Sequence, residues 1–454
     1  VAEVIHPYDG AVLDTVPVGA PADISAALNG LEQGAAVMRA LPTHRRVEIL
    51  RRTAQLMAEQ QEDLARLISR EEGKVLAEGR IEAGRAMETL DLSADAARDL
   101  HGETVPLDAT PGGIGKLGFT LRVPCGIVAA ITPFNFPLNL VAHKIGPAIA
   151  GGNAVLLKPA SDTPLSALKL VELLLEAGLP EEAIACVTGP GGELGEAICA
   201  DARVRKISFT GSAEVGEAIT RAAGLKRVTM ELGSNSPVIV LDEADVAKVA
   251  RTLAVTGYAN AGQVCISSQR VIATPGAHAD LLDALRTEVQ QLVAGDPLAE
   301  GTQVGPLIRE RDAARVETWL GEAVTQGAEL LCGGSREGAV VQPALLANVA
   351  PEMKLSCEEL FGPALGVTRA PDVEAAIALA NETRFGLSAA VFTQDIDRAM
   401  RFAREVDSGN LHINFGTAWR AEIMPYGGLK ESGFGKEGPS YAVQEMTESK
   451  MVVI

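Results

Sequence analysis

Apolar and polar positions alternate in two long blocks, and the first block runs from residue 126 to residue 223. Short, mostly apolar runs predict strands at 126–132, 154–157, 184–187 and 206–209. A segment with helical periodicity follows each run, at 139–150, 164–177, 193–200 and 213–223. Strands that are apolar on both faces, each followed by a helix, are typical of a parallel sheet covered by helices on both sides.

The second block repeats this alternation between residues 236 and 392. The pattern predicts strands at 236–241, 270–273 and 389–392. It predicts helices at 244–259, 279–294, 311–326 and 373–380. We therefore expect a second α/β domain after the first.

The remaining segments follow other patterns. Residues 1–30 mix short β-like pieces with turns, whereas 39–100 have helical periodicity among many charges, which predicts surface helices with solvated charged faces. Glycines and prolines interrupt 102–122, which predicts a linker or an extended arm. The apolar end, 451–454, predicts a strand that pairs with a neighbouring subunit or folds back.

Composition narrows the class of protein. A chain of 454 residues is long enough for two or three domains, and its formal net charge of −19 argues against nucleic acid or an anionic membrane as a partner. The sequence has neither an apolar run of the roughly 18 residues that a bilayer span needs nor a basic and then apolar leader. We expect a cytoplasmic protein.

The six cysteines of the chain are widely spaced. Neither a disulfide framework nor a metal site is therefore expected.

Three polar residues in glycine- or proline-flanked turns are candidates for catalysis. Cys265 follows a glycine and precedes polar residues, a setting that presents a thiol rather than packing it. Glu231 and Asn135 occupy two other turns, each after an apolar strand. A thiol, a carboxylate and an amide supply a nucleophile, a base and an oxyanion donor. A core cysteine, a turn-capping glutamate and a turn asparagine are the structural alternatives.

Seven motifs resemble those of the aldehyde dehydrogenase superfamily, in the family's order and across essentially the whole chain. They are Pro133-Phe134-Asn135-Phe136-Pro137, Lys158-Pro159-Ala160, Phe209-Thr210-Gly211-Ser212, Glu231-Leu232-Gly233, Gly262-Gln263-Val264-Cys265, Glu359-Leu360-Phe361-Gly362-Pro363 and Pro425-Tyr426-Gly427-Gly428-Leu429-Lys430-Glu431-Ser432-Gly433. The resemblance implies an α/β fold with a parallel-sheet, Rossmann-like cofactor domain, a second α/β catalytic domain and a small β oligomerisation arm. We expect the cofactor domain in 1–105 and 125–231, the catalytic domain in 232–432, and the arm in 106–124 and 433–454. The resemblance also implies a homodimer or a homotetramer.

The resemblance assigns the chemistry. The thiolate of Cys265 would add to an aldehyde, and Asn135 with the backbone N–H of Cys265 would bind the oxyanion. Hydride would leave to NAD or NADP, and Glu231 would activate the water that hydrolyses the thioester. Glu437 matches a position that relays protons from Glu231 to solvent.

The resemblance also places the cofactor. The residues implied in its binding are Thr132, Pro133, Phe134, Lys158, Ala160, Ser161, Gly191, Gly195, Phe209, Gly211, Ser212, Val215, Leu232, Gly233, Glu359 and Phe361. Many NAD-selective members carry a glutamate where this chain has Ser161, and its absence removes repulsion against a 2′-phosphate. We expect NAD, with NADP accepted as well, because no arginine stands beside Ser161.

The resemblance implies a substrate pocket that contains Phe136 and Arg420. Arg420 lies in the stretch 419–426, which is most similar to enzymes of small oxygenated or anionic aldehydes, such as lactaldehyde, phosphonoacetaldehyde and non-phosphorylating glyceraldehyde-3-phosphate dehydrogenases. Arg420 could hold an anionic group, or it could be a surface arginine or part of an interface ion pair. Val264 stands where phosphonoacetaldehyde dehydrogenases carry an arginine, so one cation for a doubly charged substrate is missing.

Two other functions are compatible with the same motifs. A CoA-acylating semialdehyde dehydrogenase would use the cysteine but lack the base, so Glu231 argues against it. A homologue that has lost catalysis and serves in structure or binding would have lost Cys265, Glu231 or Asn135, and all three are present.

Overall fold

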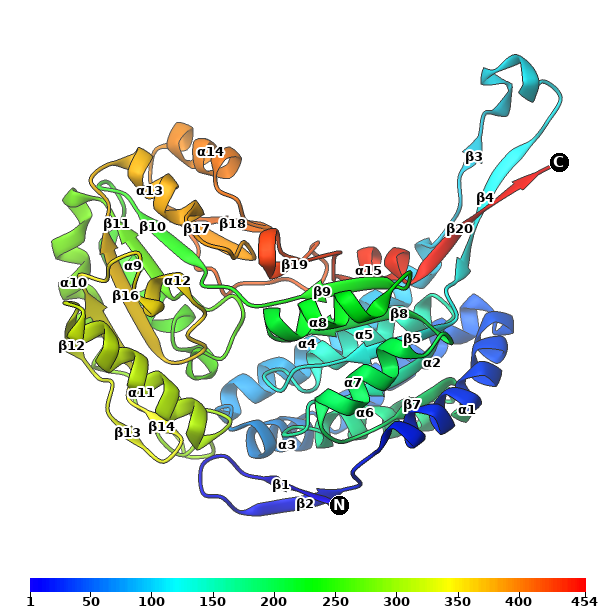
Figure 1. Ribbon diagram of the computed structural model, residues 1–454, viewed down its shortest axis with the longest axis horizontal. Helices are drawn as coiled ribbons and strands as arrows, with labels where there is room; N and C mark the ends of the chain where they lie inside the picture. The colour runs from blue at the N-terminus through cyan, green and yellow to red at the C-terminus, as the bar shows by residue number, and fades with distance from the viewer.

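The computed structural model describes residues 1–454, which form two α/β domains and a projecting β arm (Figure 1). The sheet of the first domain has six strands in the order β19-β9-β8-β5-β6-β7. These strands are β5 (Ile127–Ile131), β6 (Ala154–Lys158), β7 (Ile184–Cys186), β8 (Val204–Thr210), β9 (Arg227–Glu231) and β19 (Gly433–Phe434). All neighbours are parallel except β19, which is antiparallel to β9.

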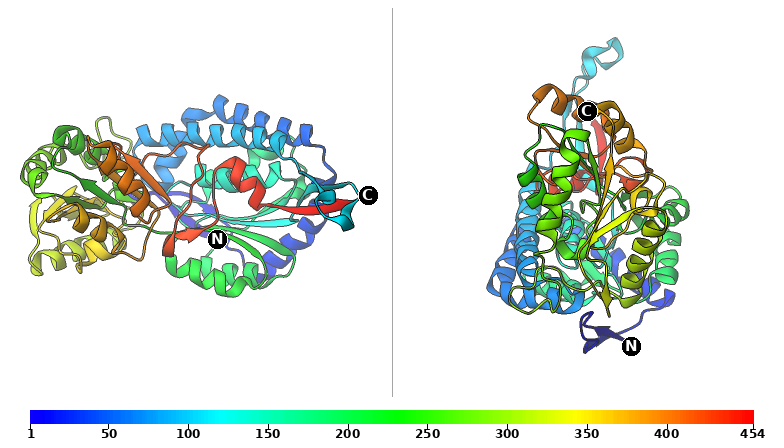
Figure 2. Two further views of the ribbon diagram at one scale, coloured as in Figure 1. Left: turned by 90° about the horizontal axis from the view of Figure 1, so that it is seen from above. Right: turned by 90° about the vertical axis from the view of Figure 1, so that its left-hand side faces the viewer.

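Helices cover both faces of this sheet (Figures 1 and 2). One layer consists of α2 (Thr43–Glu59), α3 (Gln61–Glu72), α4 (Leu76–Asp99), α5 (Asn139–Ala150), α6 (Leu165–Glu176) and α15 (Pro439–Glu445). The other consists of α1 (Pro21–Ala40), α7 (Gly191–Ala200) and α8 (Ala213–Ala223). On β5, Val128 and Ala130 join the core of the first layer, whereas Ile127, Ala129 and Ile131 join that of the second. Alternation between two buried faces explains why this strand is apolar throughout.

The second domain has a seven-stranded sheet in the order β12-β15-β16-β11-β10-β17-β18, parallel except for β12. Its strands are β10 (Pro237–Val240), β11 (Arg270–Ala273), β12 (Glu329–Cys332), β15 (Ala344–Ala347), β16 (Ala364–Arg369), β17 (Ser388–Phe392) and β18 (Asn410–Ile413). Its helices are α9 (Val246–Thr256), α10 (Pro275–Val289), α11 (Glu310–Thr325), α12 (Lys354–Cys357), α13 (Val373–Asn381) and α14 (Ile396–Glu405). A short hairpin of β13 (Arg336–Glu337) and β14 (Val340–Val341) lies beside α11.

The arm is a three-stranded antiparallel sheet that projects away from both domains (Figures 1 and 2). It contains β3 (Thr104–Val105), β4 (Gly118–Pro124) and β20 (Thr447–Val453). β20 is an edge strand, and the last apolar side chains, including Met451 and Ile454, are exposed. At the other end of the chain, β1 (Ala2–Ile5) and β2 (Val12–Val16) form a separate hairpin.

The α/β fold class with its parallel sheets is confirmed. No helix has both the length and the apolar character that a membrane span requires. Two expected segments differ from the structure. Residues 21–30 are helical rather than β-like, because α1 begins at Pro21 and buries Ile24, Leu28 and Leu31 along one face. Residues 433–446, expected in the arm, lie with the first domain, because β19 pairs with β9 and α15 packs on α4 and α5.

The expectation that the charges of 39–100 are all solvated is wrong. Glu71, Glu72, Lys74 and Glu82 are buried. Glu71 accepts hydrogen bonds from the first backbone N–H groups of α6, and Glu82 accepts them from residues at the start of α5. Neither helix has a side-chain cap of its own, so these carboxylates satisfy donors that would otherwise be buried without partners.

Candidate active site

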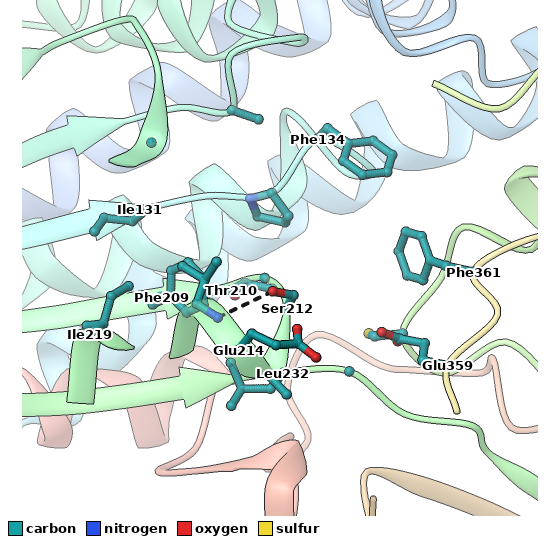
Figure 3. A pocket seen from close by; sticks show the side chains of 18 of the residues that line it. Ile131, Phe134, Phe209, Thr210, Ser212, Glu214, Ile219, Leu232, Glu359 and Phe361 are labelled. Atoms are coloured by element: carbon teal, nitrogen blue, oxygen red, sulfur yellow. Dashed lines mark hydrogen bonds between the residues drawn. The ribbon is translucent and has the colours of Figure 1, made fainter. Parts of the chain in front are cut away.

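A cavity of about 1170 Å³ lies between the two domains, at the carboxyl ends of the strands of the first sheet. Its lining includes Asn135, Cys265 and every residue expected to bind the cofactor. Figure 3 shows part of this lining, with Phe134 from the first domain and Phe361 from the second facing each other across the opening. The two rings meet edge to face, with centroids 5.9 Å apart.

The order of the strands explains this position. β6 lies on one side of β5 and β8 on the other, so the chain reverses direction across the sheet at β5. Ligands of open α/β sheets bind at such a switch point, where the loops after the two strands diverge. Here those loops carry Thr132 and Ser212.

The loop that carries Cys265 begins in a strained conformation. Asn260 and Ala261 have positive φ angles of 50° and 53°, which cost energy for residues other than glycine. Asn260 is held by Glu72, which accepts from its side chain at 2.9 Å, and by Glu78, which accepts from its backbone N–H at 3.1 Å. A Cβ on Gly262 would lie 2.1 Å from the carbonyl oxygen of Gly362, so glycine lets the two loops meet.

The sulfur of Cys265 lies 3.0 Å from the hydroxyl of Tyr426. Burial raises the pKa of the Cys265 thiol to about 12, and the charges of Glu359 and Glu231 raise it further, while Tyr426 and Arg420 act in the opposite direction. The resting sulfur is therefore a thiol at neutral pH, and its activation requires a base.

The side chain of Asn135 is directed at the same loop. Its amide nitrogen donates a hydrogen bond of 2.8 Å to the carbonyl of Gln263, two residues before the cysteine. Its other amide hydrogen remains available to a ligand of the cavity. Phe136, the next residue, packs with Cys265 in a small apolar cluster that also contains Val264, Ile266 and Tyr426.

Glu231 ends β9 beside this cluster and outside the wall of the large cavity. Both of its carboxylate oxygens are buried without a hydrogen-bond partner. Burial, followed by the charge of Glu437, raises its pKa well above the usual value. A buried carboxylate with free oxygens and a raised pKa has the properties of a general base that waits for a water molecule.

Glu437 is buried and paired with two cations. It accepts from Lys144 at 2.8 Å and from Arg420 at 3.3 Å. Burial would raise its pKa, but Lys144 and Arg420 lower it to about 2. Glu437 therefore remains ionised across the neutral range, which suits a fixed charge beside Glu231 better than a carrier of protons.

Arg420 is buried and is therefore not a surface arginine. Its guanidinium is buried, with nitrogens that contact Glu437 at 3.3 Å and His143 at 3.2 Å. One face of the guanidinium covers the ring of Tyr426, at 3.9 Å from the ring centroid. His143 contacts Glu422, which also pairs with Arg85. The cations of this cluster are thus balanced by carboxylates within the chain.

The cavity wall suits a dinucleotide. At the start of α7, a Cβ on Gly191 or Gly195 would meet nothing within 4 Å, so this wall is bare backbone against which a flat ring can lie. The N-terminus of α8, capped by Ser212, presents backbone donors suited to a pyrophosphate (Figure 3). Lys158 also reaches the cavity, and burial lowers its pKa to about 8. These features fit NAD or NADP.

On the opposite wall, Glu359 lies against a glycine. A Cβ on Gly233 would come within 2.3 Å of the Glu359 carboxylate, which accepts from the backbone N–H of Ser234 at 2.9 Å. Glycine at this position therefore lets the carboxylate reach the cavity. Burial raises the pKa of Glu359 to about 7.

Several residues of the site carry no signal in the sequence pattern. Lys74, His143 and the ion pair between Asp162 and Arg309 belong to no motif, and each contacts partners distant in the chain. Tyr426 lies inside the motif at 425–433. An aromatic residue in a glycine-rich turn was the signal that could have marked it as a residue of the site.

The comparisons with known proteins agree with this geometry. Residues 1–452 match the aldehyde dehydrogenase family. The chain is 43% identical over 452 residues to the 3-sulfolactaldehyde dehydrogenase of Priestia megaterium, covering 100% of this chain and 94% of that protein. It is 39% identical over 456 residues to the lactaldehyde dehydrogenase of Methanococcus vannielii, covering 100% and 97%.

A solved structure extends the likeness to three dimensions. The glyceraldehyde-3-phosphate dehydrogenase of Methanocaldococcus jannaschii, in complex with NADP, superposes with a TM-score of 0.96 at 37% identity. The match covers 100% of this chain and 98% of that one. The chain therefore belongs to the aldehyde dehydrogenase family and is an NAD(P)-dependent aldehyde dehydrogenase.

Proposed function

We propose that this enzyme oxidises a short hydroxy- or anionic aldehyde to the carboxylate through a covalent intermediate on Cys265. The observation that carries the proposal is the convergence of three groups on one cavity. Cys265 and Asn135 line it, and Glu231 stands beside it with two unpartnered oxygens. These are a nucleophile, an oxyanion donor and a base.

In the first step the sulfur of Cys265 adds to the carbonyl carbon. The free amide hydrogen of Asn135 and the backbone N–H of Cys265, which donates to no carbonyl in the chain, bind the oxygen as it becomes negative. One such donor lowers a barrier by roughly 3 kcal/mol. NAD(P), held by the residues of the cavity wall, would supply the hydride acceptor, and loss of the hydride would leave the substrate bound to Cys265 as a thioester.

Glu231 acts as the general base. It takes a proton from water, whose oxygen attacks the thioester carbon, and the carbon–sulfur bond breaks to release the carboxylate product and the thiolate. The same carboxylate can accept the proton of the resting thiol, because burial raises the pKa of Glu231 and so makes it a stronger base. We propose that Glu437 assists by keeping the pKa of Glu231 high, and we prefer this role to the relay expected from the sequence.

The cofactor is held by the residues that line the cavity. We propose that Lys158 binds the adenosine ribose, that Ser212 and the start of α8 bind the pyrophosphate, and that Glu359 binds the nicotinamide ribose beside Phe361. The hydroxyl of Ser161 donates to the carbonyl of Gly189 at 2.9 Å and adds no charge near the ribose. This neutrality supports the use of both NAD and NADP.

We propose that the substrate lies over the apolar cluster of Phe136, Val264 and Tyr426, which also contacts Cys265. Arg85 borders this cluster, with its guanidinium 5.7 Å from the ring of Phe136, and remains partly exposed. Because Arg420 is covered by its partners, we propose Arg85 as the first cation to meet an anionic substrate, with Arg420 behind it. The likeness to a sulfolactaldehyde and a lactaldehyde dehydrogenase supports a short hydroxy- or anionic aldehyde as the substrate.

The experiment compares lactaldehyde with 3-sulfolactaldehyde, which differ by one sulfonate, in steady-state assays with NAD and with NADP. Turnover of either aldehyde that is lost in Cys265→Ala is the expected result. Arg85→Gln should lower kcat/KM for the sulfonate by about tenfold and leave the neutral aldehyde unchanged. The proposal fails if neither aldehyde is oxidised by protein that binds the cofactor normally.

The alternatives are tested in the same assay. A requirement for CoA, with an acyl-CoA product, would identify a CoA-acylating enzyme, but the unpartnered oxygens of Glu231 favour water. A homologue that serves only in structure or binding would show no turnover. The presence of Cys265 and Asn135 in the cavity lining, and of Glu231 with unpartnered oxygens, supports catalysis instead.

We propose a homodimer or homotetramer in which the open edge of β20 pairs with a second copy. The exposed side chains of Met451, Val453 and Ile454 along this edge support pairing. We also propose that the protein works in the cytoplasm. All six cysteines are free thiols, which is typical of proteins in a reducing compartment.

A further inference from the structure

The sulfur of Cys265 has one polar side-chain partner, the phenol of Tyr426. The two atoms are 3.0 Å apart, within hydrogen-bond distance for sulfur. Tyr426 is almost fully buried, and its backbone pairs with that of Glu437 through bonds of 2.7 and 3.2 Å. The ring packs against Val264 and Ile266 on either side of the cysteine in sequence. The hydroxyl is therefore held at the sulfur by packing and by backbone hydrogen bonds.

The direction of this hydrogen bond follows from the protonation of the two groups. Burial, followed by the charge of Cys265, raises the pKa of Tyr426 well above its usual value, so the phenol keeps its proton. A thiolate has no hydrogen to donate and can only accept. Whenever the sulfur is negative, Tyr426 must be the donor.

A cation stands behind the phenol. The guanidinium of Arg420 covers the Tyr426 ring at 3.9 Å, and its nitrogens are fixed by Glu437 and His143. A cation over the ring withdraws electron density from the phenol and makes its O–H a stronger donor. The groups that oppose a negative sulfur are the carboxylates of Glu231 and Glu359. Tyr426 and Arg420 are thus the two groups that favour the thiolate.

We propose that Tyr426 is a catalytic residue that stabilises the thiolate of Cys265 by donating a hydrogen bond to it. This inference rests on the proposed role of Cys265 as nucleophile. The bond acts twice in each cycle. It stabilises the sulfur when the thiol loses its proton to Glu231, and again when water has added to the thioester and the electron pair of the carbon–sulfur bond returns to sulfur. The phenol keeps its own proton in both steps.

The test is the pH dependence of alkylation of Cys265 by iodoacetamide, in protein without aldehyde or cofactor. The variant Tyr426→Phe keeps the ring and removes the hydroxyl. Tyr258→Phe is the matched control, because it removes the other fully buried phenol, whose hydroxyl donates to the carbonyl of Ala344 at 2.7 Å. Cys265→Ser identifies the reacting sulfur, and ultraviolet absorbance of the thiolate gives a second readout.

At each pH below the pKa of the thiol, Tyr426→Phe should lower the alkylation rate of Cys265 by about tenfold, whereas Tyr258→Phe should leave the rate unchanged. The thiolate absorbance at the same pH should fall in parallel. An unchanged rate in Tyr426→Phe, or an equal loss in both variants, would overturn the inference. Failure of the proposed function is seen separately, as turnover that survives Cys265→Ala.

Discussion

The ammonium group of Lys74 donates a hydrogen bond of 2.7 Å to the backbone carbonyl of Asn135, the residue proposed to bind the oxyanion. The same nitrogen pairs with Glu82 at 2.6 Å, and both side chains are buried. Glu82 in turn accepts from the backbone N–H groups of Leu138 and Asn139. A buried ion pair at the start of α4 thus contacts the turn that presents Asn135 and the first residues of α5.

Lys74→Met should destabilise the protein and slow catalysis. Removal of one partner leaves the carboxylate of Glu82 buried without a cation, which costs about 3–5 kcal/mol in free energy of unfolding. Urea unfolding measures this loss. Lys169→Met is the control, because it breaks an exposed pair with Glu172 and should change stability by less than about 0.5 kcal/mol. Similar stability of the two variants would contradict the argument.

Activity should rise with pH from the neutral to the alkaline range. Burial raises the pKa of Cys265 to about 12, and burial with Glu437 raises that of Glu231. Both groups work in their deprotonated forms, so a raised pKa means that activity is lost as the pH falls. A plot of kcat/KM against pH, restricted to pH values at which the protein stays folded, tests this. A profile that is flat down to acidic pH would contradict it.

Glu437→Gln should move the acidic limb of the plot of kcat/KM against pH to lower pH. The substitution removes a negative charge that raises the pKa of Glu231 and leaves Lys144 and Arg420 to lower it. We expect a shift of about one pH unit. The control Glu431→Gln changes an exposed carboxylate that pairs with Arg384 and should leave the limb in place. A lower kcat at every pH without a shift would instead indicate that Glu437 relays protons.

Ser161→Glu should make the enzyme selective for NAD. A carboxylate at this position of the cavity wall would repel a 2′-phosphate, so kcat/KM for NADP should fall by more than about tenfold, while that for NAD is retained. The control Ser161→Gln introduces a side chain of nearly the same size as glutamate but without its charge. It should leave the ratio of kcat/KM for NADP to kcat/KM for NAD closer to that of the wild type. Equal losses for both cofactors in Ser161→Glu would show that this residue does not face the ribose.

Local patterns in the sequence predicted the parallel sheets and the elements around the cavity. The strand β5 is apolar on both faces because it packs on two helical layers, and that arrangement leaves a signal in the sequence. Asn135 and the glycines of the cavity wall are signalled by turns that follow such strands, and Cys265 is signalled by the glycine and the polar residues around it. The position of each of these residues is set by its own turn, and a pattern in the sequence can predict a turn.

The partners of these residues depend on contacts between distant segments. Glu71 and Glu82 look like charges of solvated helices, yet they bind backbone N–H groups of other helices. Arg420 is surrounded by groups from three segments, among them His143 and Glu437. No periodicity within α3 or α4 distinguishes a carboxylate that faces solvent from one that caps a neighbouring helix. Burial of a charge is decided by what packs against it.

The central claim is that Cys265 carries the substrate as a thioester that Glu231-activated water hydrolyses. The most direct measurement is the intact mass of Glu231→Gln after a single turnover with NAD(P) and an aldehyde that the wild type oxidises, followed by peptide mapping. The account predicts an added acyl group on the peptide that contains Cys265. Absence of any adduct while the variant still reduces the cofactor, or an adduct on another of the six cysteines, would contradict it.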